Sequence, residues 1–454
     1  MHKTTSLKEK LTLFSTLLFP ILITQLSMFS MTFINTIMSG RAGAADLAGV
    51  AIGASLWVPM FSGINGILIA ITPIIAQLTG AKATKDIPGR VQQAIYVSIG
   101  LAIIILLIGF FALDPILNMM DLEQNVRHIA KYYLVALSTG IIPLFIFNTL
   151  RSFIDSLGKT RVSMTIILIS LPINVLFNYV FIFGKFGVPA FGGIGSGIAT
   201  SLTYLLTSII IVGIIHKVRP FSDLKILSSW QRPSLKAWIE QLKIGVPIGV
   251  SIFFETSIFS AMTIFMSVYS TYTIAAHQAA MNFSSLLYMI PLSVGMTLTI
   301  AVGFEVGAKR FVDARTYSYI GLSGGVFIAI IAGLILFVFD DQIAMLYSNE
   351  PAVFDLTKKF LFFAIFFQFA DAFAAPIQGA LRAYKDVNVT LITSFISYWL
   401  IGLPTGWLLA NYTELGPYGY WVGIIAGLSA GAIALIFRLL YIQKKYPAKE
   451  QSHS

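Results

Sequence analysis

Long apolar runs, separated by short charged breaks, cover almost the whole chain. Each run holds about 20 or more residues, the length that an α-helix needs to cross a bilayer. Helices of this length satisfy their own backbone hydrogen bonds in lipid. The pattern therefore predicts an all-α polytopic membrane protein with twelve transmembrane helices. The runs lie near 10–38, 48–79, 91–115, 128–152, 162–184, 191–216, 238–268, 273–304, 314–338, 353–382, 388–411 and 417–441.

Positive charges are distributed unevenly among the breaks between these runs. If the N-terminus is cytoplasmic, 24 of the 30 Lys and Arg residues fall in cytoplasmic segments. Such a bias fixes the orientation of a membrane protein. An even number of spans then places both termini in the cytoplasm, and we expect a multi-pass protein of the cytoplasmic (cell) membrane.

Composition supports the membrane class and limits the partners. The chain is 57% hydrophobic and 11% charged, against about 25% charged residues in soluble domains. The net charge of +10 could indicate a nucleic-acid partner. The excess lies in the cytoplasmic breaks, however, so we expect membrane lipid around the protein and no nucleic acid.

The two halves of the chain repeat one another. The most hydrophilic stretch, residues 216–238, separates six runs from six. A shift of 227 residues without a gap aligns Pro20 with Pro247 and the tripeptide "GAK" at 80–82 with the same tripeptide at 307–309. Halves with an even number of spans run parallel, and parallel repeats in transporters enclose a substrate site.

This organisation predicts two parallel six-helix lobes around a central cavity. We expect an N-lobe at 1–215, a cytoplasmic linker at 216–237 and a C-lobe at 238–454. It favours a carrier that works by alternating access over a channel or an intramembrane enzyme.

Two acidic residues lie deep within apolar runs, where a charge is costly and usually functional. They are Glu255 in "IGVSIFFETSIFSAM" and Asp371 in "IFFQFADAFAAPIQGA". No Lys or Arg is expected at the same depth. They are either separate acids kept protonated by the low dielectric, or a shared site for a coupling cation, Na⁺ or H⁺.

Uncharged polar residues accompany the two acids. Gln278 and Asn282 are four apart and share a helix face, and Gln368 precedes Asp371 by three. We expect these three side chains to join the cation site.

The first half contains amides rather than deep acids. Asn35 ends the first run, and Asn174 and Asn178 share a face of the run at 162–184. Interhelical hydrogen bonding is common in membrane bundles and is one interpretation. A polar functional site in the N-lobe is the other.

The sequence contains few features that indicate catalysis or cofactor binding. The chain has no cysteine, so thiolate metal sites and cysteine nucleophiles are excluded. The five histidines are scattered and form no H-E-x-x-H pair. We therefore predict that the protein is not an enzyme and needs no cofactor besides the coupling ion.

Several stretches together resemble the multidrug and toxic compound extrusion (MATE) transporters, and specifically their NorM branch. They are "LRSFIDSLGKTRVSMTI" (150–166), "AAHQAAMNFSSLLYMIPLSVGMTLTIAVGFEVGAKR" (275–310), "FFQFADAFAAPIQGALRAYKD" (366–386) and "YWLIGLPTGWLL" (398–409). Each is weak alone, but their order and spacing are specific. The resemblance extends over essentially the whole chain.

The resemblance implies export of organic cations in exchange for Na⁺ or H⁺. Glu255 and Asp371 match the C-lobe acids of the family's cation site, and Asn174 and Asn178 match its N-lobe polar residues. Asn35 stands where the family has a carboxylate. The amide is either a natural replacement or an engineered Asp-to-Asn change, and it puts full coupled transport by this chain in doubt.

The resulting hypothesis is a cation-coupled antiporter, a monomer, that exports small amphipathic cations. The alternative is a flippase for lipid-linked precursors, whose phosphates require deep Lys or Arg. Aromatic walls suit an amphipathic cation. The candidate wall residues are Phe254, Phe283, Tyr288, Phe367 and Trp399.

Overall fold

Continuous apolar runs form long helices in the computed structural model, which describes the backbone of residues 1–451. No β-strand occurs among these residues. Within this described backbone, up to twelve helical segments are long and apolar enough to cross a membrane. The predicted all-α polytopic fold is therefore confirmed. The last three residues of the predicted C-lobe, 452–454, lie outside the described part.

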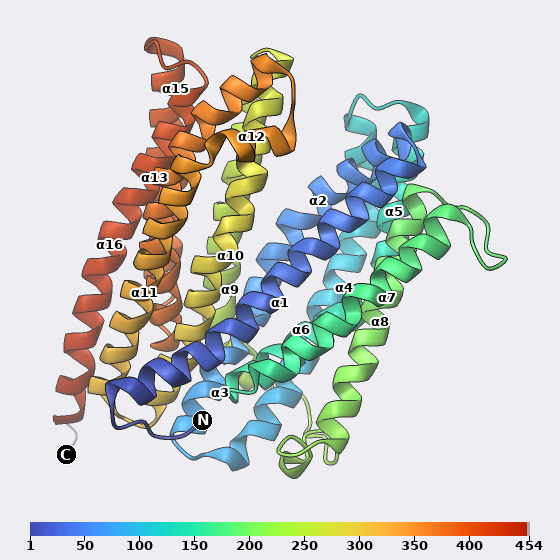
Figure 1. Cartoon of the computed structure of the whole chain (residues 1–454). Helices are drawn as coiled ribbons and strands as arrows, with labels where there is room; N and C mark the ends of the chain where they lie inside the picture. Colours follow the sequence, from blue (N-terminus) through green and yellow to red (C-terminus); the bar gives the residue numbers. More distant parts are fainter. Residues whose placement is uncertain (452–454) are drawn as a thin grey trace. The chain divides into compact units, whose positions relative to one another are not determined.

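The chain divides into two units (Figure 1). Unit 1 comprises residues 1–22, 79–81 and 247–454, and unit 2 comprises 23–78 and 82–246. The predicted lobe boundaries at 215 and 238 stay a prediction.

Unit 2 holds the helices of the first half. They are most of α1 (Leu7–Ala42), α2 (Ala44–Leu68), most of α3 (Ile71–Gly80), the short η1 (Thr84–Asp86), α4 (Ile87–Met119), α5 (Gln124–Ser138), α6 (Ile141–Ser156), α7 (Thr160–Phe183), α8 (Gly193–Lys217) and the short η2 (Ser222–Leu224).

Unit 1 holds the helices of the second half. They are most of α9 (Leu235–Met266), α10 (Thr271–Gly307), α11 (Phe311–Val338), the short α12 (Asp340–Tyr347), α13 (Pro351–Ala383), α14 (Asn388–Ser394), the π-helix η3 (Phe395–Gly402), α15 (Leu403–Tyr412) and α16 (Tyr418–Gln451). The start of α1 and the end of α16 lie at the same end of this unit, as an even number of spans requires (Figure 1).

One predicted span is broken. The run at 128–152 forms α5 and α6, which are bent by 52° at a short break. Gly140 lies in this break, and Pro143 follows in the first turn of α6. Glycine and proline both weaken helix continuity. A side chain at position 140 would also meet the Cα atom of Ser201 at 2.8 Å, so the break is packed closely against α8.

Small residues allow α10 and α13 to pack very closely in unit 1. A Cβ atom on Gly379 would lie 2.0 Å from the carbonyl oxygen of Gly295. At the same place, the Thr299 hydroxyl donates to the Gly379 carbonyl at 2.9 Å. Close backbone approach through glycine is a common way to pack membrane helices. It fixes the part of α13 that carries the functional residues described below.

The segment between α8 and α9 is packed against α4 within unit 2 and is not a free tether. Gln92 of α4 donates to the carbonyls of Ile226 at 2.6 Å and Ser229 at 2.8 Å. Gln93 donates to the carbonyl of Arg232 at 2.9 Å. Two consecutive glutamines thus satisfy the backbone of an irregular segment, which would otherwise need water or other partners.

Candidate functional site

The two deep acids predicted from the sequence both lie in unit 1. Glu255 is on α9 and Asp371 on α13, and both side chains are buried. They are close enough for their charges to act on each other. The structure thus brings together two carboxylates that are 116 residues apart in the sequence.

Hydrogen bonds from two further helical segments hold Glu255. Its Oε1 atom accepts from the Gln378 amide at 2.7 Å and from the Ser394 hydroxyl at 3.0 Å. The Ser251 hydroxyl, one turn before Glu255, lies 2.8 Å from that of Ser394. Hydrogen bonds to a carboxylate are stronger than neutral ones. They fix the position of the Glu255 carboxylate between α9, α13 and α14.

A buried arginine accompanies the acids, and the expectation that no deep Lys or Arg would be found is wrong. Arg382 lies in the last turn of α13, and its positive charge acts on Glu255. It is only 7% exposed. Arg382 follows Asp371 by 11 residues, about three helical turns, so both can face the same side of α13. With both carboxyl groups ionised, one positive and two negative charges would give this cluster a net charge of −1.

The uncharged polar residues predicted beside the acids lie in different surroundings. Gln368 is buried, and its amide donates to the Ser284 carbonyl at 2.8 Å. Gln278 is exposed and donates weakly to Thr263 at 3.5 Å. Asn282 accepts from the Tyr347 hydroxyl at 3.0 Å. Their part in cation binding stays a prediction.

The predicted aromatic wall residues form two groups. Phe254 contacts Phe395, with ring centroids 5.0 Å apart, and its carbonyl accepts from the Trp399 indole at 3.3 Å. Tyr288 is close enough to the acidic cluster for its hydroxyl to interact with both carboxylates.

Phe367 and Phe283 belong to the hydrophobic core of unit 1. Phe367 packs edge-to-face on Phe259, and Phe283 is partly buried against the same core. Any contact that these aromatic residues make with a substrate stays a prediction.

The three amides predicted as the N-lobe site come together in unit 2. Asn178 of α7 donates to the Asn35 side chain at 2.7 Å and to that of Asn174 at 3.1 Å. Two threonines of α8 complete the network. The sequence analysis did not identify these two residues. Asn35 donates to Thr200 at 3.3 Å, and Asn174 to Thr203 at 3.2 Å. Thr200 and Thr203 are three residues apart and so share a helix face, which is the sequence signal that could have identified them.

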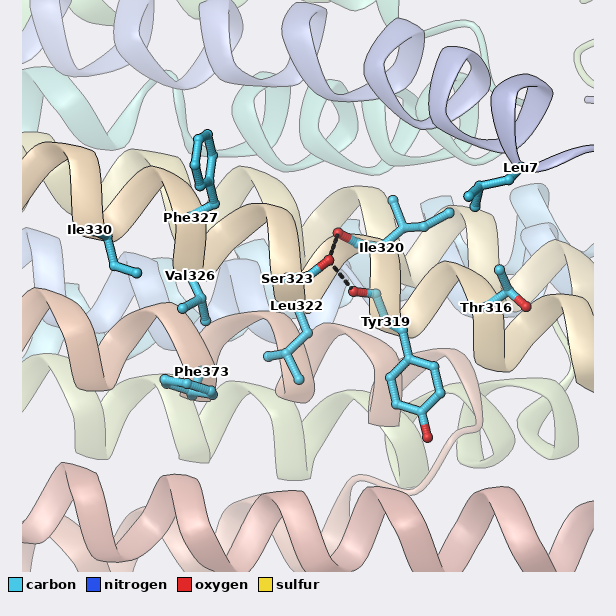
Figure 2. Close-up of a pocket in the computed structure, with 10 residues that line it drawn as sticks. All are labelled: Leu7, Thr316, Tyr319, Ile320, Leu322, Ser323, Val326, Phe327, Ile330 and Phe373. Carbon is cyan, nitrogen blue, oxygen red and sulfur yellow. Dashed lines mark hydrogen bonds between the residues drawn. The ribbon is translucent and has the colours of Figure 1, made fainter.

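A groove of about 590 Å³ runs along α11 in unit 1 (Figure 2). Its lining is apolar apart from a few hydroxyl groups. The residues are Leu7, Thr316, Tyr319, Ile320, Leu322, Ser323, Val326, Phe327, Ile330 and Phe373. The Ser323 hydroxyl is already bonded to the Tyr319 carbonyl at 2.7 Å. Without a charged residue in its lining, the groove is not a candidate ion site.

The sequence profile of the MatE family matches this chain twice. The matches cover residues 20–180 and 247–408. Their first residues, Pro20 and Pro247, are 227 positions apart, which is the shift that aligned the two halves. The internal repeat predicted from the sequence is therefore confirmed.

Solved structures of MATE transporters share the fold. The eukaryotic transporter AtDTX14 covers 98% of this chain and 99% of its own, with a TM-score of 0.84 and 22% identity. A point mutant of VcmN from Vibrio cholerae covers 96% of this chain and 98% of its own, with a TM-score of 0.88 and 19% identity.

Closer relatives in sequence carry the name probable multidrug resistance protein NorM. The protein from Oceanobacillus iheyensis is 66% identical over 98% of this chain and 100% of its own length. The protein from Bacillus subtilis is 55% identical over 99% of this chain and 100% of its own length. With the two profile matches, these identities establish that the chain belongs to the NorM branch of the MATE family.

Proposed function

We propose that this protein is an antiporter that exports amphipathic organic cations in exchange for Na⁺ or H⁺, by alternating access. Family membership supports a multidrug transporter, since the related NorM proteins are named for multidrug resistance. The finer proposal, coupling to a cation, depends on the charges of the acidic cluster in unit 1.

The burial of two acids with a single arginine is the observation that carries the proposal. Glu255 and Asp371 are buried with one arginine, Arg382. Burial of an uncompensated charge is unfavourable. One monovalent cation would neutralise the remaining negative charge. A proton on a carboxyl group or a Na⁺ ion bound by carboxylate oxygens would serve equally.

Competition for this charge would link the two transported species. A cationic substrate near the cluster weakens binding of the coupling ion, and the ion weakens binding of the substrate. Such linkage between two ligands is reciprocal. If the conformations that face the two sides of the membrane differ in affinity for each ligand, exchange follows.

The charge pattern favours an exporter of cations over a flippase for phosphate-bearing lipid precursors. The described residues contain two buried arginines, Arg151 and Arg382. Each has a buried acid close enough to act on its charge. Neither offers the uncompensated positive charge that a phosphate group requires.

We further propose a monomer that spans the cell membrane many times, with both termini in the cytoplasm. Its partners would be small cationic molecules and membrane lipid, with no nucleic acid. No enzymatic step and no cofactor besides the coupling ion enter this proposal.

The decisive experiment measures efflux of a fluorescent organic cation from proteoliposomes, with Na⁺ and pH gradients imposed separately. We expect at least one gradient to accelerate efflux. Efflux that ignores both gradients would overturn the coupling proposal while leaving passive drug transport intact.

Glu255→Gln should abolish acceleration by the gradient, because the amide cannot bind a proton or carry a charge. A loss of tenfold or more corresponds to about 1.4 kcal/mol or more of coupling. Glu305→Gln is a suitable control, since Glu305 is also buried in unit 1 but pairs with Arg310 outside the cluster. Unchanged gradient dependence in Glu255→Gln would refute the assignment.

A further inference from the structure

The repeat allows the acidic cluster of unit 1 to be compared with unit 2, position by position. The same 227-residue shift relates Lys82 to Lys309, which have φ values of 58° and 60°. It also relates Gly158 to Lys385, with φ values of 77° and 59°. The left-handed turns after α3 and α6 thus recur after α10 and α13. Together with Pro20 and Pro247, which precede Met28 and Glu255, these turns keep the register on both sides of the functional positions.

In this register, three residues of the cluster have definite counterparts. Glu255, Gln378 and Arg382 correspond to Met28, Arg151 and Asp155. The contact between the first two of these positions occurs in both units, although the residues differ. Gln378 donates to Glu255 at 2.7 Å in unit 1, and Arg151 donates to the Met28 sulfur at 3.0 Å in unit 2.

Each unit therefore buries one acid and one arginine at these three positions, in a different arrangement. Asp155 is 5% exposed and Arg151 is 3% exposed. Among the described residues of unit 2, Asp155 is the one buried carboxylate and Arg151 the one buried basic residue. Such charges are expensive to bury, and each requires an explanation.

The buried acid and arginine of unit 2 leave part of their hydrogen-bonding capacity unused. The Asp155 Oδ1 and Arg151 Nε atoms have no hydrogen-bond partner. Arg151 reaches only a thioether through Nη1, and thioether sulfur is a weak acceptor. Buried polar atoms are usually hydrogen-bonded, so each of these two orphaned atoms requires an explanation.

Other buried polar groups lie near the pair. The Ser163 hydroxyl of α7 lies near Asp155 and acts on its carboxyl group. The Asn148 side chain, two turns before Asp155 on α6, has neither its donor nor its acceptor satisfied. Arg151 is the charged group that faces Asp155, while α7 contributes Ser163 and α1 contributes Met28.

We propose that Asp155 is a proton-binding carboxyl group of unit 2, the counterpart in the repeat of the charged cluster in unit 1. This inference rests on the proposed coupling function. On protonation, the Asp155 carboxyl group becomes a donor as well as an acceptor, so it can donate to the neighbouring Ser163 hydroxyl. Arg151 then loses its compensating charge, so proton binding changes the interactions that join α6, α7 and α1.

The test is the pH profile of efflux in proteoliposomes of the full chain, with wild-type, Asp155→Asn and Asp155→Glu proteins. We expect Asp155→Asn to move the midpoint of the profile by about one pH unit or more, or to abolish it. Asp155→Glu should retain a pH response, because it keeps a carboxyl group.

The double variant Arg151→Gln, Asp155→Asn separates a proton site from a structural pair. It removes both charges, so no isolated buried charge is left to unfold the protein. If the pair is only structural, the double variant will have the wild-type pH profile, and the proposal is wrong. If Asp155 binds the proton, the profile of the double variant stays shifted or lost, as in Asp155→Asn.

A second measurement distinguishes this proposal from the coupling function itself. Purified protein in weak buffer with a pH indicator is mixed with tetraphenylphosphonium, and released protons are counted. If Asp155→Asn releases as many protons as the wild-type protein, the role of Asp155 is refuted. Coupling at Glu255 would remain intact. Absence of any gradient dependence in wild-type efflux would instead refute the coupling function.

Discussion

Asn35 determines the charge of the amide network in unit 2. It accepts a hydrogen bond from Asn178 and donates one to Thr200, so both groups of its amide are used. A protonated carboxyl group could make the same two bonds, because it also has one acceptor and one donor. An ionised carboxylate could not donate. The amide therefore resembles the protonated acid and holds the network in one charge state at every pH.

Asn35→Asp should raise efflux and make it more dependent on pH or Na⁺. An acid at position 35 would add a group that can bind and release a cation in unit 2. Efflux of the two forms would be compared across pH and Na⁺ concentration. Asn35→Ser is the control, since it keeps a polar group that cannot ionise and should behave like the parent. Identical ion dependence in Asn35→Asp would indicate that the amide network plays no part in coupling.

At the residue scale, the sequence revealed the deep acids but not their neutralising partner. Glu255 and Asp371 are conspicuous because they interrupt long apolar runs. Arg382 lies at the end of such a run, where a basic residue ordinarily faces the membrane surface. Only the packing of α13 shows that its side chain turns inward. The sequence position of a charge near a helix end does not indicate its direction.

At the scale of elements, the segment between α8 and α9 is held by side chains of α4. Gln93 is buried and makes two hydrogen bonds to this segment and one to the first turn of α9. Its amide donates to the Arg232 carbonyl, and its carbonyl accepts from the Ser234 backbone and the Trp238 indole, each at 2.9 Å. The segment should therefore move with unit 2.

Gln93→Leu should release this segment, because it leaves three polar groups without their partner. Each unmade bond to a buried group costs about 1–3 kcal/mol. We expect trypsin to cleave the purified variant at Lys225 at least about tenfold faster than the parent protein. Gel analysis of the two fragments measures the cleavage rate. Gln124→Leu serves as the control, since Gln124 is exposed in the same unit. Equal cleavage rates in the two variants would contradict the inferred docking.

The positions of the spans were largely predictable, whereas their internal breaks were not. Hydropathy over about 20 residues finds a span whether it is straight or bent. The bend between α5 and α6 depends on a glycine and a proline, and such residues are also tolerated within straight transmembrane helices. The docking of Gln92 and Gln93 was not predictable either, since their partners are backbone atoms about 135 residues away.

At the scale of the whole molecule, the repeat was more predictable than the packing. Apolar side chains face both lipid and core in a membrane protein, so the hydrophobic pattern does not show which face of a helix is buried. Phe327 is 63% exposed on α11, while Phe360 is fully buried on α13. Both lie in similar apolar sequence. Repeat register, by contrast, depends on rare residues such as Pro20 and Pro247, which keep their spacing.

The orientation of the chain in the membrane can be tested without removing any native residue, because the sequence contains no cysteine. Ser228 lies in the segment after α8, which the charge distribution places in the cytoplasm. Asn349 lies between α12 and α13, on the predicted outer side. In intact cells, a membrane-impermeant maleimide should label Asn349→Cys and not Ser228→Cys. After the cells are opened, both should react, because both side chains are exposed. Labelling of Ser228→Cys alone in intact cells would mean the opposite orientation. The concentration of 24 of the 30 Lys and Arg residues on one side of the membrane would then need another cause.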